Sequence, residues 1–183
     1  VSASGAFAED NGNVPSMTNF DERDNIVYKM YADGVWGETQ TLYNGTSGNV
    51  KGIVTAMLED GTAAVAYTLD TDRQDGTVTD REIVYAVVGA DGQVLRNVQA
   101  TNDAYLDENP QLTAVRFGGE QRFVLGWYTE QAAAADSAAV LDGGGESTGG
   151  ETVSDIRLLE FDASGTTGQL LPDSINKAAN AYD

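Results

Sequence analysis

Residues 82–92, EIVYAVVGADG, decide the fold, because a run of β-branched, aromatic and aliphatic side chains ends there in an Asp-Gly turn. The same pattern occurs at residues 25–34, NIVYKMYADG, and at residues 155–165, DIRLLEFDASG. Each copy predicts a β-strand that enters a tight turn in which Gly supplies a positive φ angle. The spacing of the first two copies fits four short strands with their turns, as in a propeller blade.

The segments between these copies contain a second repeated pattern. Residues 55–70 and 113–130 each show an apolar strand, an acidic or Gly-rich turn and a second strand with an aromatic residue near its end, which is typical of a β-hairpin. A short strand of alternating polar and apolar residues follows each copy of the first pattern, at 37–43, 93–99 and 169–171. One unit is therefore predicted to be an antiparallel meander of four strands.

We expect a single all-β segment over residues 1–183, with a partial blade at 1–48, a blade at 49–107 and a blade at 108–183 that contains an inserted loop at 131–153. These four-stranded antiparallel units are predicted to stack as propeller blades. About two and a half blades cannot close a ring, since closure needs about four or more. The exposed faces and edges would then be covered by the remainder of a longer chain or by self-association. A β-sandwich of the same strands is the alternative architecture.

The composition narrows the classes of function. The chain has 29 acidic and 10 basic residues, so its formal net charge is -19 at pH 7. This charge repels phosphate and anionic lipid, and no apolar run approaches the ~20 residues of a membrane span, so we expect neither nucleic-acid binding nor membrane insertion. The absence of cysteine and histidine removes disulfides, thiolate nucleophiles, Cys or His metal sites and the commonest general base. Cation binding through oxygen ligands remains open.

Two of the strand and turn units carry a family resemblance. Residues 26–28, IVY, lead to 33–36, DGVW, and residues 82–85, EIVY, lead to 91–92, DG. These units resemble the repeats of bacterial extracellular β-propellers of the sialidase-like group, called Asp-box or BNR repeats. Asp-boxes serve the fold rather than catalysis. The resemblance therefore implies a propeller in a secreted or cell-surface protein, such as an adhesion protein, without implying sialidase activity.

One rim of the predicted blades collects most of the polar loops. The loops between second and third strands are 9–24, 71–81 and 131–154, and the loops that join one unit to the next are 44–49 and 101–109. In a propeller these two kinds of loop share one rim of the disc. Loops of variable length on a constant scaffold commonly carry function, so we expect ligands to bind at this rim.

The densest group of carboxylates in the sequence lies in residues 70–80, DTDRQDGTVTD. Asp70, Asp72, Asp75 and Asp80 surround a glycine, and calcium takes six to eight oxygen ligands from flexible loops. The sequence therefore makes these four aspartates a candidate calcium site, with no other cofactor expected. The alternative is a solvated acidic turn in which the Asp side chains accept backbone N–H bonds.

A second group, formed by Asp103, Tyr105, Asp107 and Glu108, is expected on the same rim as a ligand-binding site. The aromatic face of Tyr105 could stack on a sugar ring beside the carboxylates. Trp127, on a predicted strand, is expected to pack between blades.

Three functional hypotheses follow from the sequence. The first is a non-catalytic, extracellular or bacterial cell-surface segment whose acidic rim binds carbohydrate or protein. The second is a fragment of a sialidase-like glycoside hydrolase, because paired carboxylates can hydrolyse glycosides, although no single pair stands out in so acidic a chain. The third is a structural spacer in a large surface protein. We expect no catalytic residues.

Overall fold

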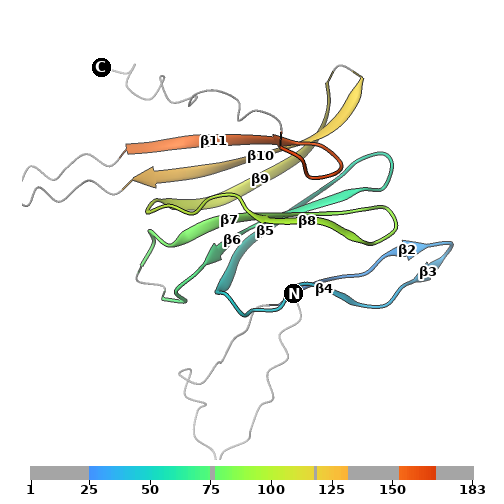
Figure 1. The fold of residues 1–183 in the computed structure, drawn as a ribbon, viewed down its shortest axis with the longest axis horizontal. Helices are drawn as coiled ribbons and strands as arrows, with labels where there is room; N and C mark the ends of the chain where they lie inside the picture. Colours follow the sequence, from blue (N-terminus) through green and yellow to red (C-terminus); the bar gives the residue numbers. More distant parts are fainter. Residues whose placement is uncertain (1–24, 75–76, 118, 132–152, 168–183) are drawn as a thin grey trace, which may run out of the picture.

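The computed structural model describes residues 25–74, 77–117, 119–131 and 153–167, which form strands and no helix (Figure 1). The strands are β1 (Ile26–Tyr28), β2 (Tyr31–Ala32), β3 (Val35–Trp36), β4 (Gln40–Tyr43), β5 (Asn49–Met57), β6 (Ala63–Asp70), β7 (Arg81–Val88), β8 (Val94–Gln99), β9 (Leu106–Phe117), β10 (Glu120–Gln131) and β11 (Val153–Phe161). The predicted all-β class is confirmed. The predicted strands at residues 1–8 and 169–171 and most of the inserted loop 131–153 lie outside the described residues.

The strands form four separate antiparallel sheets. The largest has the order β5-β6-β7-β8, and β9, β10 and β11 form a second sheet with β10 in the centre. Two small sheets pair β1 with β4 and β2 with β3. Consecutive strands are neighbours in the two larger sheets, so each is a meander, and none of the sheets closes into a barrel.

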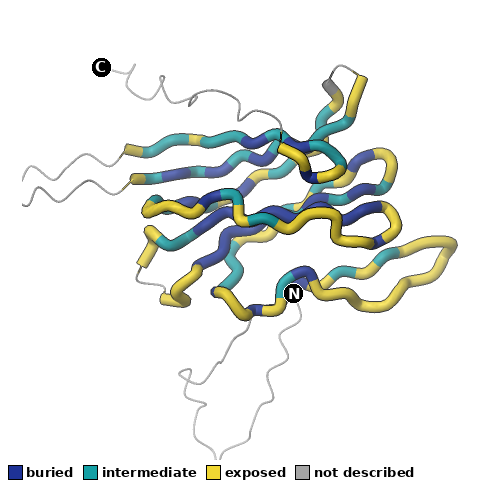
Figure 2. The backbone as a smooth tube through the Cα atoms, viewed as in Figure 1, coloured by how far each residue is buried: buried dark blue, intermediate teal, exposed yellow. Residues whose placement is uncertain are grey.

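The four-stranded sheet is the middle layer of the molecule, because its inner strands β6 and β7 are buried on both faces (Figure 2). On β7, Ile83, Tyr85 and Val87 face one hydrophobic core, and the intervening Val84, Ala86 and Val88 face the other. This is the two-residue alternation of a strand, and the continuously apolar sequence reflects burial on both sides. The sequence of β7 therefore indicates that other layers pack on both faces of this sheet.

Two hydrophobic cores hold the layers together. The first lies between the β5–β8 and β9–β11 sheets and consists of Leu58, Ala64, Ala66, Ile83, Tyr85, Val87, Phe123, Leu125, Trp127, Leu159 and Phe161. The second joins the β5–β8 sheet to the β1/β4 pair and consists of Ile26, Leu42, Tyr67, Leu69, Val84, Ala86 and Val88. Trp127, predicted to pack between units, is 4% exposed and belongs to the first core.

Three turns share one hydrogen-bonded form. In residues 58–61, 89–92 and 162–165, the N–H of the final glycine donates to the carbonyl oxygen three positions earlier, at 3.1, 2.8 and 2.9 Å. The glycines have φ angles of +90°, +83° and +75°, a region that favours glycine because it has no Cβ. The Gly residues of the repeated pattern thus stand where the backbone requires them.

The meander brings alternate strand ends to one edge. Asn49 at the start of β5 lies opposite Asp70 at the end of β6, and Asp70 lies opposite Arg81 at the start of β7. Arg81 Nη1 is 3.0 Å from Oε2 of Glu108 near the start of β9, so the two larger sheets meet at this edge. We call it the loop edge; its described connections are residues 44–48, 71–74 with 77–80, and 100–105.

Candidate functional site

Two carboxylate clusters lie on the loop edge. In each, one carboxylate oxygen from every member lies within 4.8 Å of the others. We call them the Asp70 cluster, formed by Asp70, Asp72 and Asp80, and the Glu82 cluster, formed by Glu82, Asp103 and Asp107. Either set of oxygen ligands could hold a metal ion.

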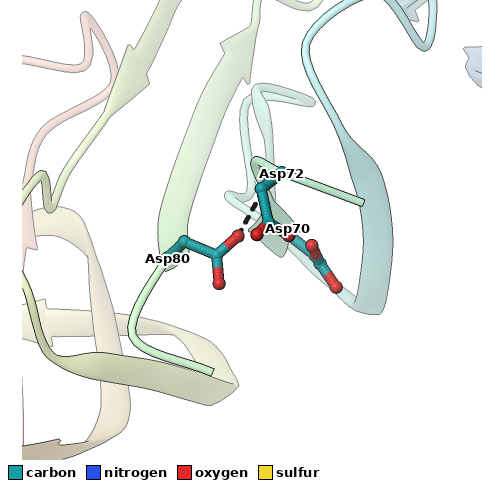
Figure 3. Close-up of side chains that lie close together, drawn as sticks. All are labelled: Asp70, Asp72 and Asp80. Carbon is teal, nitrogen blue, oxygen red and sulfur yellow. Dashed lines mark hydrogen bonds between the residues drawn. The ribbon is translucent and has the colours of Figure 1, made fainter. Parts of the chain in front are cut away.

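The Asp70 cluster gathers three of the four aspartates predicted as metal ligands (Figure 3). Asp70 is the last residue of β6, and Asp72 and Asp80 belong to the loop that leads to β7. The N–H of Asp72 donates to Asp80 Oδ2 at 2.9 Å, which ties the two ends of the loop together. Asp75, the fourth predicted ligand, lies outside the described residues.

The loop uses the carboxylates of the Asp70 cluster for its own hydrogen bonds. Asp72 accepts from the Gln74 N–H at 2.7 Å and from the Thr77 hydroxyl at 2.7 Å. The hydrogen bond from Thr77 is the main reason that the pKa of Asp72 lies below its ordinary value. These bonds have the form expected for a solvated acidic turn, the alternative that the sequence left open.

Buried oxygens with unused hydrogen-bonding capacity also concentrate around Asp70. Lys51 Nζ is 3.5 Å from Asp70 Oδ2, an ion pair whose geometry is not that of a hydrogen bond. Asp70 Oδ2, Asp80 Oδ1 and Asn49 Oδ1 are all buried without a hydrogen-bond partner. The Asp70 cluster therefore contains both a basic neighbour and free acceptor oxygens.

The Glu82 cluster joins the two larger sheets at the loop edge. Glu82 is the second residue of β7, Asp103 lies in the connection from β8 to β9, and Asp107 is the second residue of β9. Asp107 is 0% exposed and Glu82 is 3% exposed, whereas Asp103 reaches solvent. This cluster combines two of the predicted ligand-binding residues with a glutamate that the sequence analysis did not select.

Hydrogen bonds orient the two buried carboxylates. Glu82 accepts from the Thr101 hydroxyl at 2.6 Å and from the Asp103 N–H at 3.2 Å. Asp107 Oδ1 accepts from Trp127 Nε1 at 2.9 Å. Burial is the largest influence on both acids and raises the pKa of Glu82 and of Asp107, because it disfavours the charged form.

Glu82 was not selected as a candidate site residue from the sequence, because it is continuous with the apolar residues of a predicted strand. Its signal in the sequence is an acidic residue directly before the buried run Ile83 to Val88, where a charge needs a local partner. Asp103 and Asp107 lie more than one strand-and-turn later in the chain. Their approach to Glu82 depends on how the β5–β8 and β9–β11 sheets stack.

Tyr105 and Glu108, the other two predicted ligand-binding residues, have different partners. The guanidinium carbon of Arg157 lies 5.2 Å from the centroid of the Tyr105 ring, and Arg157 Nη1 is 3.3 Å from Asp103 Oδ2. Glu108 pairs with Arg81. The expected open aromatic face of Tyr105 is thus engaged by a cation, which was not anticipated.

A cleft of about 590 Å³ opens beside the Glu82 cluster. Its wall combines polar groups of the loop edge with aromatic and aliphatic groups of both larger sheets: Tyr85, Arg96, Val98, Gln99, Ala100, Thr101, Asn102, Asp103, Trp127, Arg157, Leu159 and Thr167. The cleft therefore offers hydrogen-bond donors and acceptors from Arg157, Asn102 and Asp103 next to the apolar body of Trp127.

The chain matches no protein-family model, no curated protein and no solved structure. Within the described residues, a helix long and apolar enough to cross a membrane is not found.

Proposed function

We propose that this chain is a non-catalytic segment of a secreted or cell-surface β-propeller, whose sheets are successive blades and whose loop edge binds carbohydrate. A protein ligand at the same edge is the second outcome that the experiment below distinguishes. The high net negative charge of -19 suits a soluble extracellular surface. The proposal also agrees with the Asp-box resemblance of the sequence.

The observation that carries the proposal is the burial of β6 and β7, the inner strands of the β5–β8 sheet, on both faces by two other units of the same chain. A blade inside a propeller has this environment, because each neighbouring blade covers one face. The turn at residues 89–92 after β7 and the turn at 162–165 after β11 have matching hydrogen bonds. Phe161 and Thr167 then form a bridge, as a fourth strand alongside β11 would begin.

The cleft at the loop edge supports carbohydrate as the ligand. Sugars are recognised by specifically placed polar groups, and here Arg157, Asn102 and Asp103 lie together on the wall of the cleft. The ion pair between Arg157 and Asp103 fixes both groups before a ligand arrives. We therefore expect the Arg157 guanidinium and the Asp103 carboxylate to hydrogen-bond ring hydroxyls.

Burial argues against the glycosidase alternative. A general acid must reach the glycosidic oxygen, and Glu82 and Asp107, the two acids with a raised pKa at this edge, are 3% and 0% exposed. Such carboxylates do not contact a substrate in the cleft.

Binding to a glycan array, with a matched panel of immobilised proteins, tests the proposal. Arg157→Ala should abolish glycan binding, whereas Arg116→Ala should retain it, because Arg116 pairs with Glu59 away from the loop edge and is largely exposed. Turnover of a chromogenic glycoside would overturn the non-catalytic assignment. Binding only to proteins would replace the ligand class, and no binding at all would favour the spacer.

We also propose that the ion suited to the Asp70 cluster is calcium. All its side-chain ligands are oxygens, and Asp80 Oδ1 and Asn49 Oδ1 could add to the coordination. Asp72→Asn should then weaken calcium binding measured by calorimetry. Equal calcium binding by the variant and the wild type would show that the loop is an acidic turn and no more.

A further inference from the structure

We propose that the Glu82 cluster is a second, buried cation site, in which Glu82, Asp103 and Asp107 bind calcium and join the β5–β8 sheet to the β9–β11 sheet. This site is separate from the Asp70 cluster, and it shares Asp103 with the wall of the cleft proposed to bind carbohydrate. Glu82 belongs to β7, Asp103 to the connection from β8 to β9, and Asp107 to β9.

The first argument is charge. Glu82 and Asp107 are almost fully buried, and neither has an ion-pair partner among the residues that the structure describes. The cation that does contact the cluster, Arg157, pairs with the exposed member Asp103. Buried carboxylates this close together need either a cation or a shared proton, because two uncompensated charges in a poorly solvated site repel strongly.

The second argument is an orphaned oxygen inside the site. Asp107 Oδ2 is buried without a hydrogen-bond partner, on a side chain that is 0% exposed. Thr129, directly opposite Asp107 in the pairing of β9 with β10, is 4% exposed, and its hydroxyl interacts with the Asp107 carboxylate without the geometry of a hydrogen bond. Buried polar atoms in native proteins are nearly always satisfied, so a bound group is expected at Asp107 Oδ2.

The chemistry of the ligands selects the ion. Three carboxylates and a neighbouring hydroxyl form an all-oxygen set, which suits a hard cation and not a thiophilic or imidazole-binding metal. The hydrogen bonds that Glu82 and Asp107 accept leave lone pairs for coordination, since each carboxylate oxygen has two. Asp103 also lines the cleft of about 590 Å³, which gives an ion a path from solvent.

Terbium(III) luminescence provides a direct test, because Trp127 Nε1 is hydrogen-bonded to Asp107 and can sensitise a lanthanide bound there. The measurement uses Trp36→Phe as the background, so that Trp127 is the remaining tryptophan of the two in the chain. We expect tryptophan-excited terbium emission that calcium quenches by competition. Asp107→Asn should remove it, while Asp91→Asn, which changes the same charge in a distant turn, should not.

Thermal melts with calcium and with chelator complete the test. We expect calcium to raise the melting temperature by roughly 5 °C or more in the wild type and in Asp72→Asn, but not in Asp107→Asn. Glu82→Gln replaces Asp107→Asn if that variant does not fold. A calcium effect lost in Asp72→Asn and kept in Asp107→Asn would assign the ion to the Asp70 cluster. Absence of emission and of any calcium effect would show that the Glu82 cluster holds a proton instead.

Discussion

The ring of Tyr85 on β7 stacks on the ring of Phe161 on β11, with the centroids 4.4 Å apart and the planes inclined by 26°. The Tyr85 hydroxyl also donates to the carbonyl oxygen of Gly165 at 3.1 Å. This contact joins the third strand of one sheet to the third strand of the next. Both residues lie in copies of the repeated pattern, so the repeat supplies an aromatic contact between the two larger sheets.

Truncating this aromatic pair should weaken the whole molecule. Phe161→Ala is expected to lower the free energy of unfolding by about 3–5 kcal/mol, because it removes a fully buried ring from the first core. Tyr85→Phe should cost only about 1 kcal/mol, the net value of one hydrogen bond. Urea denaturation measures both. The exposed Val153→Ala is the control, expected within about 0.5 kcal/mol of the wild type; equal effects of Phe161→Ala and Val153→Ala would refute the stacked arrangement.

Gly165 is expected to tolerate no side chain. Its φ angle is +75°, and an added Cβ would lie 2.5 Å from Cβ of Arg96 on β8. Gly119→Ala is a matched comparison, because Gly119 has a φ angle of +89° but no atom within 4 Å of the added Cβ. Gly119→Ala should cost about 1 kcal/mol for the left-handed backbone alone, and Gly165→Ala clearly more. Similar melting temperatures for the two variants would contradict the close approach of the 162–165 turn to β8.

The buried acids should give the apo protein an unusual pH profile. Burial raises the pKa of Asp107 and of Glu82, so the folded state holds their protons more tightly than the unfolded chain. The resulting stabilisation is fully present below the ordinary carboxyl pKa of about 4 and is lost as the pH rises through the raised folded value. In the presence of a chelator, the melting temperature of Asp107→Asn should therefore fall less than that of the wild type as the pH rises from about 4 to about 7.

Asp162 is a control, because its pKa is shifted in the opposite direction from those of Asp107 and Glu82. Desolvation pushes its pKa up, but hydrogen bonds from Ser164 and Thr166 outweigh it, and the net pKa is lowered. The stabilisation from Asp162 is present above the ordinary pKa and is lost as the pH falls through the folded value. Asp162→Asn should therefore flatten the acid side of the melting profile. Parallel profiles for Asp107→Asn and Asp162→Asn would contradict the assignment of these shifts.

Tyr67 should govern unfolding in alkali. Burial, and secondarily the neighbouring Tyr43, raise the pKa of Tyr67 to about 12. The stabilisation from its neutral phenol is fully present below the ordinary pKa of about 10 and is lost as the pH rises through the folded value. Tyr67→Phe should move the alkaline unfolding midpoint, followed by circular dichroism, to higher pH. The exposed Tyr31→Phe should leave it in place; an equal shift in both variants would speak against burial as the cause.

The repeated pattern predicted the strands and turns of its second and third copies because its information is local. In the first copy, the expected strand is divided into β1 and β2, which belong to different sheets. The continuous apolar run of β7 reports burial on both faces, and an Asp-Gly step reports the positive φ angle of its turn. The same is true of the Asp70 cluster, whose three aspartates lie within one loop and its strand end. Their proximity follows from sequence separation alone.

The partners of Tyr105 and Glu82 could not be predicted in this way. Arg157 reaches Tyr105 from β11, and Asp107 reaches Glu82 from the neighbouring sheet. The approach of Asp107 to Glu82 depends on how the two larger sheets stack, and that of Arg157 to Tyr105 on the order of β9, β10 and β11 within one sheet. No local pattern encodes either arrangement.

By itself, the sequence determined an all-β chain of meanders with glycine turns and an acidic edge, because strand alternation and turn chemistry act over a few neighbouring residues. Only the tertiary structure decided that Glu82 and Asp107 share a buried site and that Arg157 covers Tyr105. Those contacts arise when large apolar faces exclude water, and the side chains brought together at their margin come from distant parts of the chain.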